Sequence, residues 1–263
     1  MKFTKIQGAG NDFIIIDNRS GEISRDSYPA LAKSLCVRRL SIGADGLMMV
    51  ERPEAGGDLQ MVFYNNDGSE GEMCGNGARC AARYAFEHGL VRDDQDIRFL
   101  ATAGEIRGRR ITEDLYEVRL NNPSVVDRHR LAVTPDETVP CCYVELGSPG
   151  IPHAVVRVGP EAFEDLDALR ERGRALRYSA SFPKGANVSF VCQTGEGCVR
   201  AITFERGVED FTLACGTGAG AIAVSMNESL QVDMPGGTLS IRLVKDGGMV
   251  KELYLTGPTE ISQ

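Results

Sequence analysis

A five-residue motif that occurs twice constrains this chain more than any other feature. Residues 74–78 read Cys-Gly-Asn-Gly-Ala and residues 215–219 read Cys-Gly-Thr-Gly-Ala, so the two cysteines are 141 positions apart. In each half of the chain, a β-rich segment and an acidic turn precede the motif and a helical pattern follows it. This self-similarity indicates an internal duplication. We therefore expect two domains of like plan, which suits a chain of 263 residues.

The composition is that of an ordinary globular protein and argues against several classes of function. Hydrophobic residues make up 42% of the chain and charged residues 25%. The net charge is −8 and no basic cluster is present, so nucleic-acid binding is not expected. The first residues lead into glycines rather than a continuous apolar segment. We therefore expect no signal peptide, no membrane span and a cytoplasmic location.

Eight cysteines without an export signal are expected to be reduced thiols. No metal site is expected, because Cys74 and Cys80 lack the close C-x-x-C spacing and the chain has only three histidines. Six of the cysteines lie on ordinary helical, strand-like or turn patterns, and we assign them no role: Cys36, Cys80, Cys141, Cys142, Cys192 and Cys198.

Apolar periodicity predicts helices separated by groups of short strands. The expected helices cover residues 28–38, 78–88, about 160–176 and the segment after 218 to about 226. The expected strands cover residues 13–17, 47–50, 59–64, 105–111, 115–120, 141–145, 154–158, 188–191 and 199–204. Asn121-Asn122-Pro123 is the expected crossing between the two domains.

The repeated motif places a cysteine immediately before a helix whose first turn is rich in glycine. Bare N–H groups at such a helix start form an anion site. The same partial positive charge favours a thiolate, and it can lower a cysteine pKa from about 8.5 to roughly 3.5–7.5. Two facing helix starts could hold one carboxylate and place Cys74 and Cys215 on opposite sides of its α-carbon. A thiolate base and a thiol acid would then invert that carbon.

A simpler interpretation is that both cysteines are small core residues, as free cysteine often is. A single motif of this kind would favour that interpretation. The duplication favours chemistry instead, because packing gives no reason for two equivalent helix-start cysteines to match.

Further motifs, taken in order along nearly the whole chain, resemble the diaminopimelate epimerase family. In the first half they are Gly8-Ala9-Gly10-Asn11-Asp12-Phe13, Gly43-Ala44-Asp45-Gly46, Tyr64-Asn65-Asn66-Asp67-Gly68-Ser69-Glu70 and Glu72-Met73-Cys74-Gly75-Asn76-Gly77-Ala78-Arg79. In the second half they are Pro152-His153-Ala154-Val155, Asn187-Val188-Ser189-Phe190, Glu205-Arg206-Gly207, Ala214-Cys215-Gly216-Thr217-Gly218 and Thr256-Gly257-Pro258.

The resemblance implies an isomerase that interconverts LL- and meso-diaminopimelate in the synthesis of lysine and peptidoglycan precursors. It implies no pyridoxal phosphate, no metal and no other cofactor. Cys74 would be the proton donor and Cys215 the proton acceptor. The residues that match substrate-binding positions are Asn11, Asn65, Gly75, Asn76, Asn187, Glu205, Arg206, Gly216 and Thr217. An arginine can bind a carboxylate through two hydrogen bonds and a glutamate can pair with an ammonium, which suits the distal end of the substrate.

The resemblance also implies the fold, which is α+β. Each of two similar domains would wrap a mixed β-sheet around a central helix, with the active site in the cleft between the domains. The first domain would cover residues 1–120, with residues from about 254 to 263 returning to it, and the second would cover residues 121–253. The implied assembly is a homodimer whose ligand is a small amino acid.

Several positions depart from the common family pattern. Gln7 stands where many members have histidine, and Ile151 stands where a common version has asparagine. Glu209-Asp210 makes the acidic turn one residue longer, and the segment 219–236 is about five residues shorter. Ile151 removes one possible polar contact with the substrate, so the sequence predicts the type of reaction more firmly than the identity of the substrate.

There are three alternatives to this function. A two-cysteine racemase of histidine or proline would use the same chemistry, although a proline-type enzyme usually has histidine where Asn76 stands. A metabolite-binding relative without catalysis is a second alternative, and retention of both cysteines argues against it. A pyridoxal-phosphate enzyme is disfavoured because no lysine has a recognisable Schiff-base setting.

Overall fold

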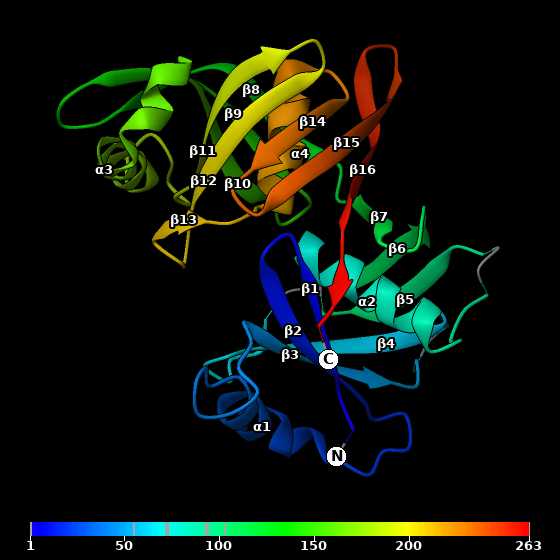
Figure 1. Ribbon diagram of the computed structural model, residues 1–263. Coiled ribbons are helices and arrows are strands. Elements are labelled where there is room, and N and C mark those ends of the chain that lie inside the picture. The colour runs from blue at the N-terminus through cyan, green and yellow to red at the C-terminus, as the bar shows by residue number, and fades with distance from the viewer. Residues whose placement is uncertain (1, 55, 72–73, 93–94, 103, 263) are drawn as a thin grey trace. The chain divides into compact units, whose positions relative to one another are not determined.

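The chain forms two compact units (Figure 1). A computed structural model describes residues 2–262 except 55, 72–73, 93–94 and 103. The first unit contains the residues up to Arg119 together with those from Thr256 onward, and the second covers Leu120–Leu255. Glu72 and Met73 of the first cysteine motif lie outside the described residues. No described helix is long and apolar enough to span a membrane.

The first unit is built around one helix that is covered by strands. Its elements are β1 (Thr4–Gly8), β2 (Asn11–Asp17), η1 (Arg25–Ser27), α1 (Tyr28–Leu35), β3 (Gly46–Glu51), β4 (Leu59–Asn65), α2 (Gly75–Glu87), β5 (Ile97–Ala101), β6 (Gly104–Arg110), β7 (Leu115–Leu120) and β17 (Glu260–Ile261). The strands pair in the order β17-β1-β2-β3-β4-β5-β6-β7. The β2–β3 and β4–β5 pairs are parallel, so the sheet is mixed.

The second unit has the same kind of sheet. Its elements are β8 (Pro123–Val133), β9 (Thr138–Leu146), β10 (Ile151–Arg157), η2 (Pro160–Glu164), α3 (Leu166–Arg177), β11 (Asn187–Gly195), β12 (Cys198–Glu205), β13 (Asp210–Thr212), α4 (Gly216–Met226), β14 (Leu230–Met234), β15 (Gly237–Asp246) and β16 (Met249–Pro258). The order of pairing is β8-β9-β10-β11-β12-β14-β15, and β13 pairs with the end of β12 on the edge opposite β11. The β10–β11 and β12–β14 pairs are parallel.

The two units repeat one topology. From β1 to β6 the successive pairs are antiparallel, parallel, antiparallel, parallel and antiparallel, and the same succession runs from β9 to β15. A helix bridges each parallel pair, because parallel neighbours need a long crossover. The cysteine motif begins the second crossover helix in both units, α2 and α4. The predicted two-domain fold, with mixed sheets around central helices, is confirmed.

Small residues allow the second crossover helix to lie inside its sheet. Every residue of α2 from Gly75 to Phe86 is buried, and most of α4 is buried as well. A Cβ at Gly220 would lie 3.0 Å from the Leu120 side chain and 3.1 Å from that of Leu253. The glycine and alanine content of α4 therefore sets how closely the strands can approach the helix.

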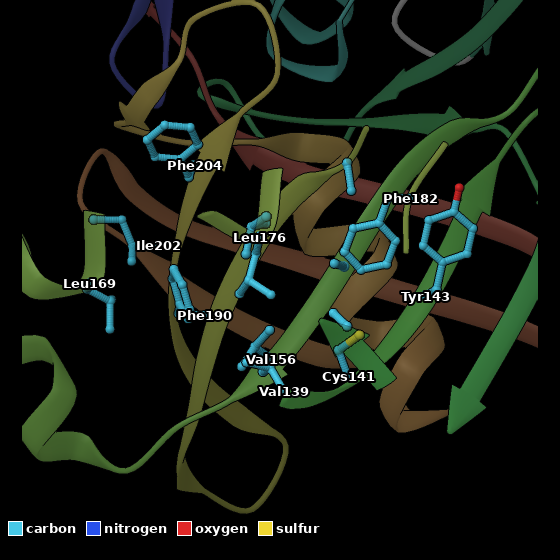
Figure 2. Close-up of a cluster of buried hydrophobic side chains, with 14 of the residues drawn as sticks. Val139, Cys141, Tyr143, Val156, Leu169, Leu176, Phe182, Phe190, Ile202 and Phe204 are labelled. Carbon is cyan, nitrogen blue, oxygen red and sulfur yellow. The ribbon is translucent and has the colours of Figure 1, made fainter. Parts of the chain in front are cut away.

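The first crossover helix covers the outer face of each sheet with a separate apolar core. In the second unit this core joins α3 to strands β9–β12 and includes Leu169, Leu176 and Phe190 (Figure 2). The rings of Tyr143 and Phe182 stack in it with centroids 5.4 Å apart. In the first unit, Tyr28 and Ala32 of α1 pack on β2, β3 and β4 in the same way. Each sheet is thus buried on both faces.

The expected helices need three corrections. A single helix over 160–176 is wrong, because Asp165 interrupts it: its Oδ1 accepts the Ala168 N–H at 3.0 Å and caps α3, leaving η2 as a separate turn. The helix α2 begins at Gly75 and not at 78, and α1 ends at Leu35 and not at 38. The expected end of α4 near Met226 is confirmed, and Asn227 terminates it in the left-handed region with φ 54°.

Candidate active site

Both motif cysteines are N-cap residues with the same local geometry. Cys74 has extended backbone angles (φ −83°, ψ 163°), and its Sγ accepts the Gly77 N–H at 3.3 Å. Cys215 is also extended (φ −119°, ψ 105°), and its Sγ accepts the Gly218 N–H at 3.3 Å. An N-cap side chain satisfies one of the donors that a helix start leaves without an intrahelical partner. The two sulfurs therefore occupy equivalent positions in the two units.

The glycines of the motif keep each sulfur close to its helix. A Cβ at Gly218 would lie 3.1 Å from Cys215 Sγ and 3.0 Å from the Thr203 hydroxyl, so a larger residue would displace the sulfur. Residues 75 and 76, like 216 and 217, lie in the first turn, where backbone N–H groups point away from the helix. Thr217 adds a hydroxyl 3.6 Å from Cys215 Sγ. Each motif is thus a helix start at which an anion can lie beside a thiol.

The two cysteines differ in exposure. Cys74 is exposed, whereas Cys215 is buried, with 7% of its surface accessible. None of the eight cysteines is in a disulfide bond. Any reagent that reaches both thiols is therefore expected to reach Cys74 first.

In the first unit, the predicted residues Asn11 and Asn76 are joined directly. The Asn76 amide donates to Asn11 Oδ1 at 2.6 Å, and the Asn11 amide donates to Asp45 Oδ2 at 3.1 Å. Arg38 pairs with Asp45 at 2.7 Å and with Asp12 at 2.5 Å. These bonds connect the first turn of α2, through Asn11 at the start of β2, to Asp45 in the segment before β3. They therefore fix the orientation of the Asn76 side chain.

Asn65, the third predicted residue of this unit, makes a different contact. Its side-chain amide donates to Ser69 Oγ at 2.9 Å within the turn that follows β4. Its register partner on β3 is Gly46, which in turn pairs with Phe13 on β2. Asn11 and Asn65 therefore lie near the same end of β3, on the two strands that flank it.

In the second unit, Asn187 and Arg206 form one group. Asn187 is buried, its Oδ1 accepts the Arg206 N–H at 2.9 Å, and its amide donates to the Pro152 carbonyl at 3.1 Å. The Arg206 guanidinium donates to the Lys184 carbonyl at 3.0 Å. Asn187 therefore holds the turn that carries Arg206 instead of presenting both of its polar atoms to solvent.

Glu205 interacts electrostatically with Cys215. Its carboxylate accepts the Thr212 hydroxyl at 2.5 Å, and it lies close enough to the Cys215 thiol for each group to shift the pKa of the other. Burial raises the pKa of Glu205, while the interactions with Thr212 and Cys215 oppose that rise. Sequence reasoning assigned Glu205 to the substrate ammonium, and nothing in the local sequence pattern indicated its contact with the thiol.

The pKa of Cys215 is raised, whereas the sequence predicted that the helix start would lower it. Burial raises the pKa of this thiol well above its ordinary value, and the negative charge of Glu205 raises it further. The bonds from Thr217 and the Gly218 N–H lower it by less. The expectation that a helix start lowers the cysteine pKa is therefore wrong for Cys215, because desolvation outweighs the helix start.

Two further residues near this group were quoted in the sequence patterns but were assigned no role. His153 on β10 is the register partner of Asn187, is fully buried, and has no hydrogen-bond partner for either ring nitrogen among the described residues. Burial lowers its pKa to about 3, so the ring is neutral. Glu209 accepts the Gly207 N–H at 2.9 Å and pairs with Arg177 at 3.1 Å, which ties the turn after β12 to the end of α3.

Within the described parts of the chain, no group of three or more His, Cys, Asp or Glu side chains could hold a metal ion. The chemistry that these residues offer is acid–base chemistry by two thiols and a carboxylate.

Comparison with known proteins connects this arrangement to one family. The family model described as Diaminopimelate epimerase matches residues 3–122 and 146–261. Diaminopimelate epimerase of Hydrogenobaculum sp. (strain Y04AAS1) is 36% identical over 98% of this chain and 95% of that protein. Diaminopimelate epimerase of Aquifex aeolicus (strain VF5) is 37% identical over 98% of this chain and 94% of that protein.

Solved structures share the fold at low identity. A phenazine biosynthesis protein of the PhzF family from Bacillus anthracis has a TM-score of 0.72 at 14% identity, with 100% of this chain and 98% of that chain covered. A probable proline racemase from Agrobacterium radiobacter K84 has a TM-score of 0.66 at 16% identity, with 99% and 92% covered. At these identities the likeness concerns the fold alone.

Proposed function

This chain belongs to the diaminopimelate epimerase family, and from that premise we propose that it interconverts LL- and meso-diaminopimelate with Cys74 and Cys215 as the acid–base pair. The observation that carries the proposal is the duplicated N-cap geometry, in which each sulfur accepts the N–H three residues onward at 3.3 Å. Two equivalent thiols at two equivalent helix starts suit a reaction that removes a proton from one face of a carbon and adds a proton to the opposite face.

The proposed reaction exchanges one proton for another on the α-carbon. A thiolate on one face removes the α-proton as its S–H bond forms, and the thiol on the opposite face gives up its proton to the same carbon. The reverse direction uses the same two sulfurs with their roles exchanged. In the assignment that the family resemblance implies, Cys74 is the donor and Cys215 the acceptor. The reacting carboxylate would bind the first-turn N–H groups of residues 75, 76, 216 and 217.

Glu205 gives Cys215 a route for its proton. The half-buried carboxylate lies beside the thiol, and desolvation raises its pKa, so it is a better proton acceptor than an exposed glutamate. We propose that Glu205 takes the Cys215 proton when Cys215 must act as the base. The same residue could alternatively bind the substrate ammonium, as the family resemblance implies, and the two roles make different predictions for kinetics.

The distal end of the substrate is proposed to bind the remaining matched residues. Arg206 supplies a guanidinium for the distal carboxylate, and Asn187 fixes its backbone. Asn11 and Asn65 supply amide groups from the first unit. A substrate with charged groups at both ends uses these residues better than histidine or proline would.

The wider setting is also proposed from the family resemblance. It comprises a role in the synthesis of lysine and peptidoglycan precursors, a cytoplasmic location, a homodimer and catalysis without a cofactor.

Proton exchange in D₂O, followed by NMR, tests the reaction and the substrate together. Reduced protein is offered LL-diaminopimelate and, separately, L-histidine, L-proline and L-glutamate, and loss of the α-proton signal is measured. Exchange with diaminopimelate alone supports the proposal. Exchange with another amino acid would keep the cysteine pair and overturn the substrate, and exchange with none would favour a binding protein without catalysis.

Substitution of the two cysteines tests the mechanism. We expect Cys74→Ala and Cys215→Ala each to abolish net inversion, because neither face alone can complete it. Cys198→Ala is the matched control, since Cys198 lies on β12, outside both cysteine motifs, and its thiol donates to Gln231 Oε1 at 3.8 Å. Substantial turnover by either alanine variant would rule out a two-base mechanism.

The mechanism requires both helix starts to reach one substrate molecule. Oxidation of the protein is therefore expected to link Cys74 to Cys215 and to stop turnover, because sulfurs on either side of one carbon are close enough to bridge once the substrate is gone. Peptide mapping identifies the link. Full activity in protein shown to carry it would contradict the proposal.

A further inference from the structure

Arg79 is a buried charge without a counter-charge. It lies on α2, one turn beyond Cys74, and none of its surface is accessible. Its Nη1 donates to the Gly75 carbonyl at 3.3 Å, whereas its Nε and Nη2 have no hydrogen-bond partner among the described residues. Arginine stays protonated at any ordinary pH, so the positive charge is present although burial lowers its pKa. Such an arrangement is unfavourable unless an anion compensates it.

The charged groups on the strands packed against α2 are already paired. These strands are β1, β2 and β6. The pairs are Lys5–Asp12, Arg38–Asp12, Arg19–Asp17, Arg107–Glu105, Arg109–Glu117 and Arg110–Glu87. On α2 itself, Arg83 donates to Asp114 at 2.9 Å and to the Thr259 carbonyl. No described carboxylate is therefore bonded to Arg79.

The adjacent cysteine is not the missing anion. A Cβ at Gly8 would lie 3.0 Å from Cys80 Sγ and 3.5 Å from Arg79 Nη2, so both groups fill the same space beside β1. Burial raises the pKa of Cys80 to about 12, even though Arg79 lowers it. Cys80 is consequently a neutral thiol at physiological pH.

Cys74 is the other thiol that interacts with Arg79. A negative charge on Cys74 favours the charged guanidinium, so the converse also holds and the guanidinium favours the thiolate. The bond from Arg79 to the Gly75 carbonyl acts in the same direction. It polarises the peptide group between Gly75 and Asn76 and strengthens the N–H at the helix start. The charge and the polarised peptide group both favour an anion at this end of α2.

We propose that Arg79 is the internal counter-charge of a Cys74 thiolate, and that in the resting protein Cys74 is the thiolate while Cys215 is the thiol. This resting state starts the direction of the reaction in which Cys74 is the base, which is the reverse of the direction in which Cys74 is the donor and Cys215 the acceptor. The catalytic meaning of this assignment rests on the proposed function, but the charge coupling itself does not. Arg79 is a positioning residue, because it acts on substrate only through Cys74. This assignment agrees with the charges near each cysteine. The positive charge of Arg79 favours a Cys74 thiolate, and the negative charge of Glu205 favours a Cys215 thiol.

The pH dependence of Cys74 alkylation tests the coupling without any substrate. Reduced protein is treated with iodoacetamide over a series of pH values, and modification of the Cys74 peptide is measured by mass spectrometry. The variants are Arg79→Met, Arg79→Lys and, as the matched control, Arg83→Lys on the same helix. We expect Arg79→Met to raise the midpoint of Cys74 alkylation by one pH unit or more, which is about a tenfold loss of thiolate below the midpoint. Arg79→Lys should restore most of the difference, and Arg83→Lys should leave the midpoint unchanged.

The outcome separates this role from a purely structural one. Replacing a buried unpaired charge by an apolar side chain of similar length is not expected to destabilise the unit, so thermal unfolding of Arg79→Met should match or exceed that of the unchanged protein. A folded Arg79→Met protein with an unchanged Cys74 midpoint would overturn the proposal, as would a wild-type midpoint at or above that of a free thiol. If the midpoint shifts as expected but no amino acid exchanges its α-proton, the coupling stands and the proposed function fails.

Discussion

Replacing Glu205 by glutamine separates the two roles that this residue could have. Glutamine has nearly the same shape and can still accept the Thr212 hydroxyl, which lies 2.5 Å from the carboxylate. It cannot take a proton from Cys215, and it removes a negative charge beside that thiol. The perturbation therefore acts on proton transfer with little change in packing.

The expected loss is large and falls on kcat. A positioned general base contributes about 10²–10⁴-fold to a rate, which corresponds to about 3–5 kcal/mol of activation free energy. We expect kcat for Glu205→Gln to fall by about two to four orders of magnitude. KM should change by less than about threefold if the carboxylate does not bind the substrate. A substrate-binding role would instead weaken binding by the worth of one charged hydrogen bond, about 1.5–3 kcal/mol.

Initial rates of α-proton exchange at several substrate concentrations give kcat and KM separately. Thr212→Val is the control, since it removes a bond to Glu205 but keeps the carboxylate, and its loss of kcat should be smaller. Alkylation of Cys215 adds an independent measurement. Because the charge of Glu205 raises the pKa of Cys215, Glu205→Gln should lower the pH midpoint of Cys215 alkylation. A raised KM with an unchanged kcat, together with an unmoved Cys215 midpoint, would refute the base role.

Three other perturbations test packing, protonation and turn geometry around the site. Gly46→Ala should destabilise the first unit by about 2–3 kcal/mol in thermal unfolding, because the new Cβ would lie 2.3 Å from the Phe63 ring. His153 is neutral when folded, with a pKa of about 3, so the unfolded chain binds a proton below pH 6.5 that the folded chain does not. Stability to urea should therefore fall as the pH drops from about 6.5 to 3, by at most about 4–5 kcal/mol, and His153→Gln should remove that part. Glu209→Ala should raise KM about tenfold, because the turn that carries Arg206 loses a charged hydrogen bond to Gly207.

Each of these perturbations has an outcome that contradicts its reasoning. Gly195→Ala, whose Cβ meets its nearest neighbour at an ordinary 3.8 Å, should have little effect, and equal losses at both glycines would show that the Phe63 contact is not the cause. A His153→Gln protein with the same pH dependence would place the acid sensitivity elsewhere. A fall in kcat rather than a rise in KM for Glu209→Ala would mean that the turn positions Glu205 more than Arg206.

Local features of the sequence were sufficient to predict that each motif cysteine precedes a helix. The helix start after Cys215 and the helix end at Asn227 follow from neighbouring residues alone, because glycine, small residues and capping side chains act over one or two turns. The repetition of the motif predicted two units of one plan for the same reason: like local sequences form like local structures. Strand β8 was missed because its residues alternate weakly, and its pairing with β9 decides its structure. Strand β15 was missed although Leu239, Ile241 and Leu243 alternate with polar residues.

Only the tertiary structure decided the charge state of the site. Whether a helix start lowers a cysteine pKa depends on burial and on charges brought from elsewhere in the chain, and these reverse the expectation at Cys215 through Glu205 and desolvation. Arg79 is a second example. Its position in a helix can be predicted from the sequence, but its lack of a counter-charge depends on how β1, β2 and β6 surround it. Sequence by itself determined which groups stand at the two helix starts, because that is set by adjacent residues. The fold determined their electrostatics, because solvation and Coulomb interactions depend on distance in space and not on separation along the chain.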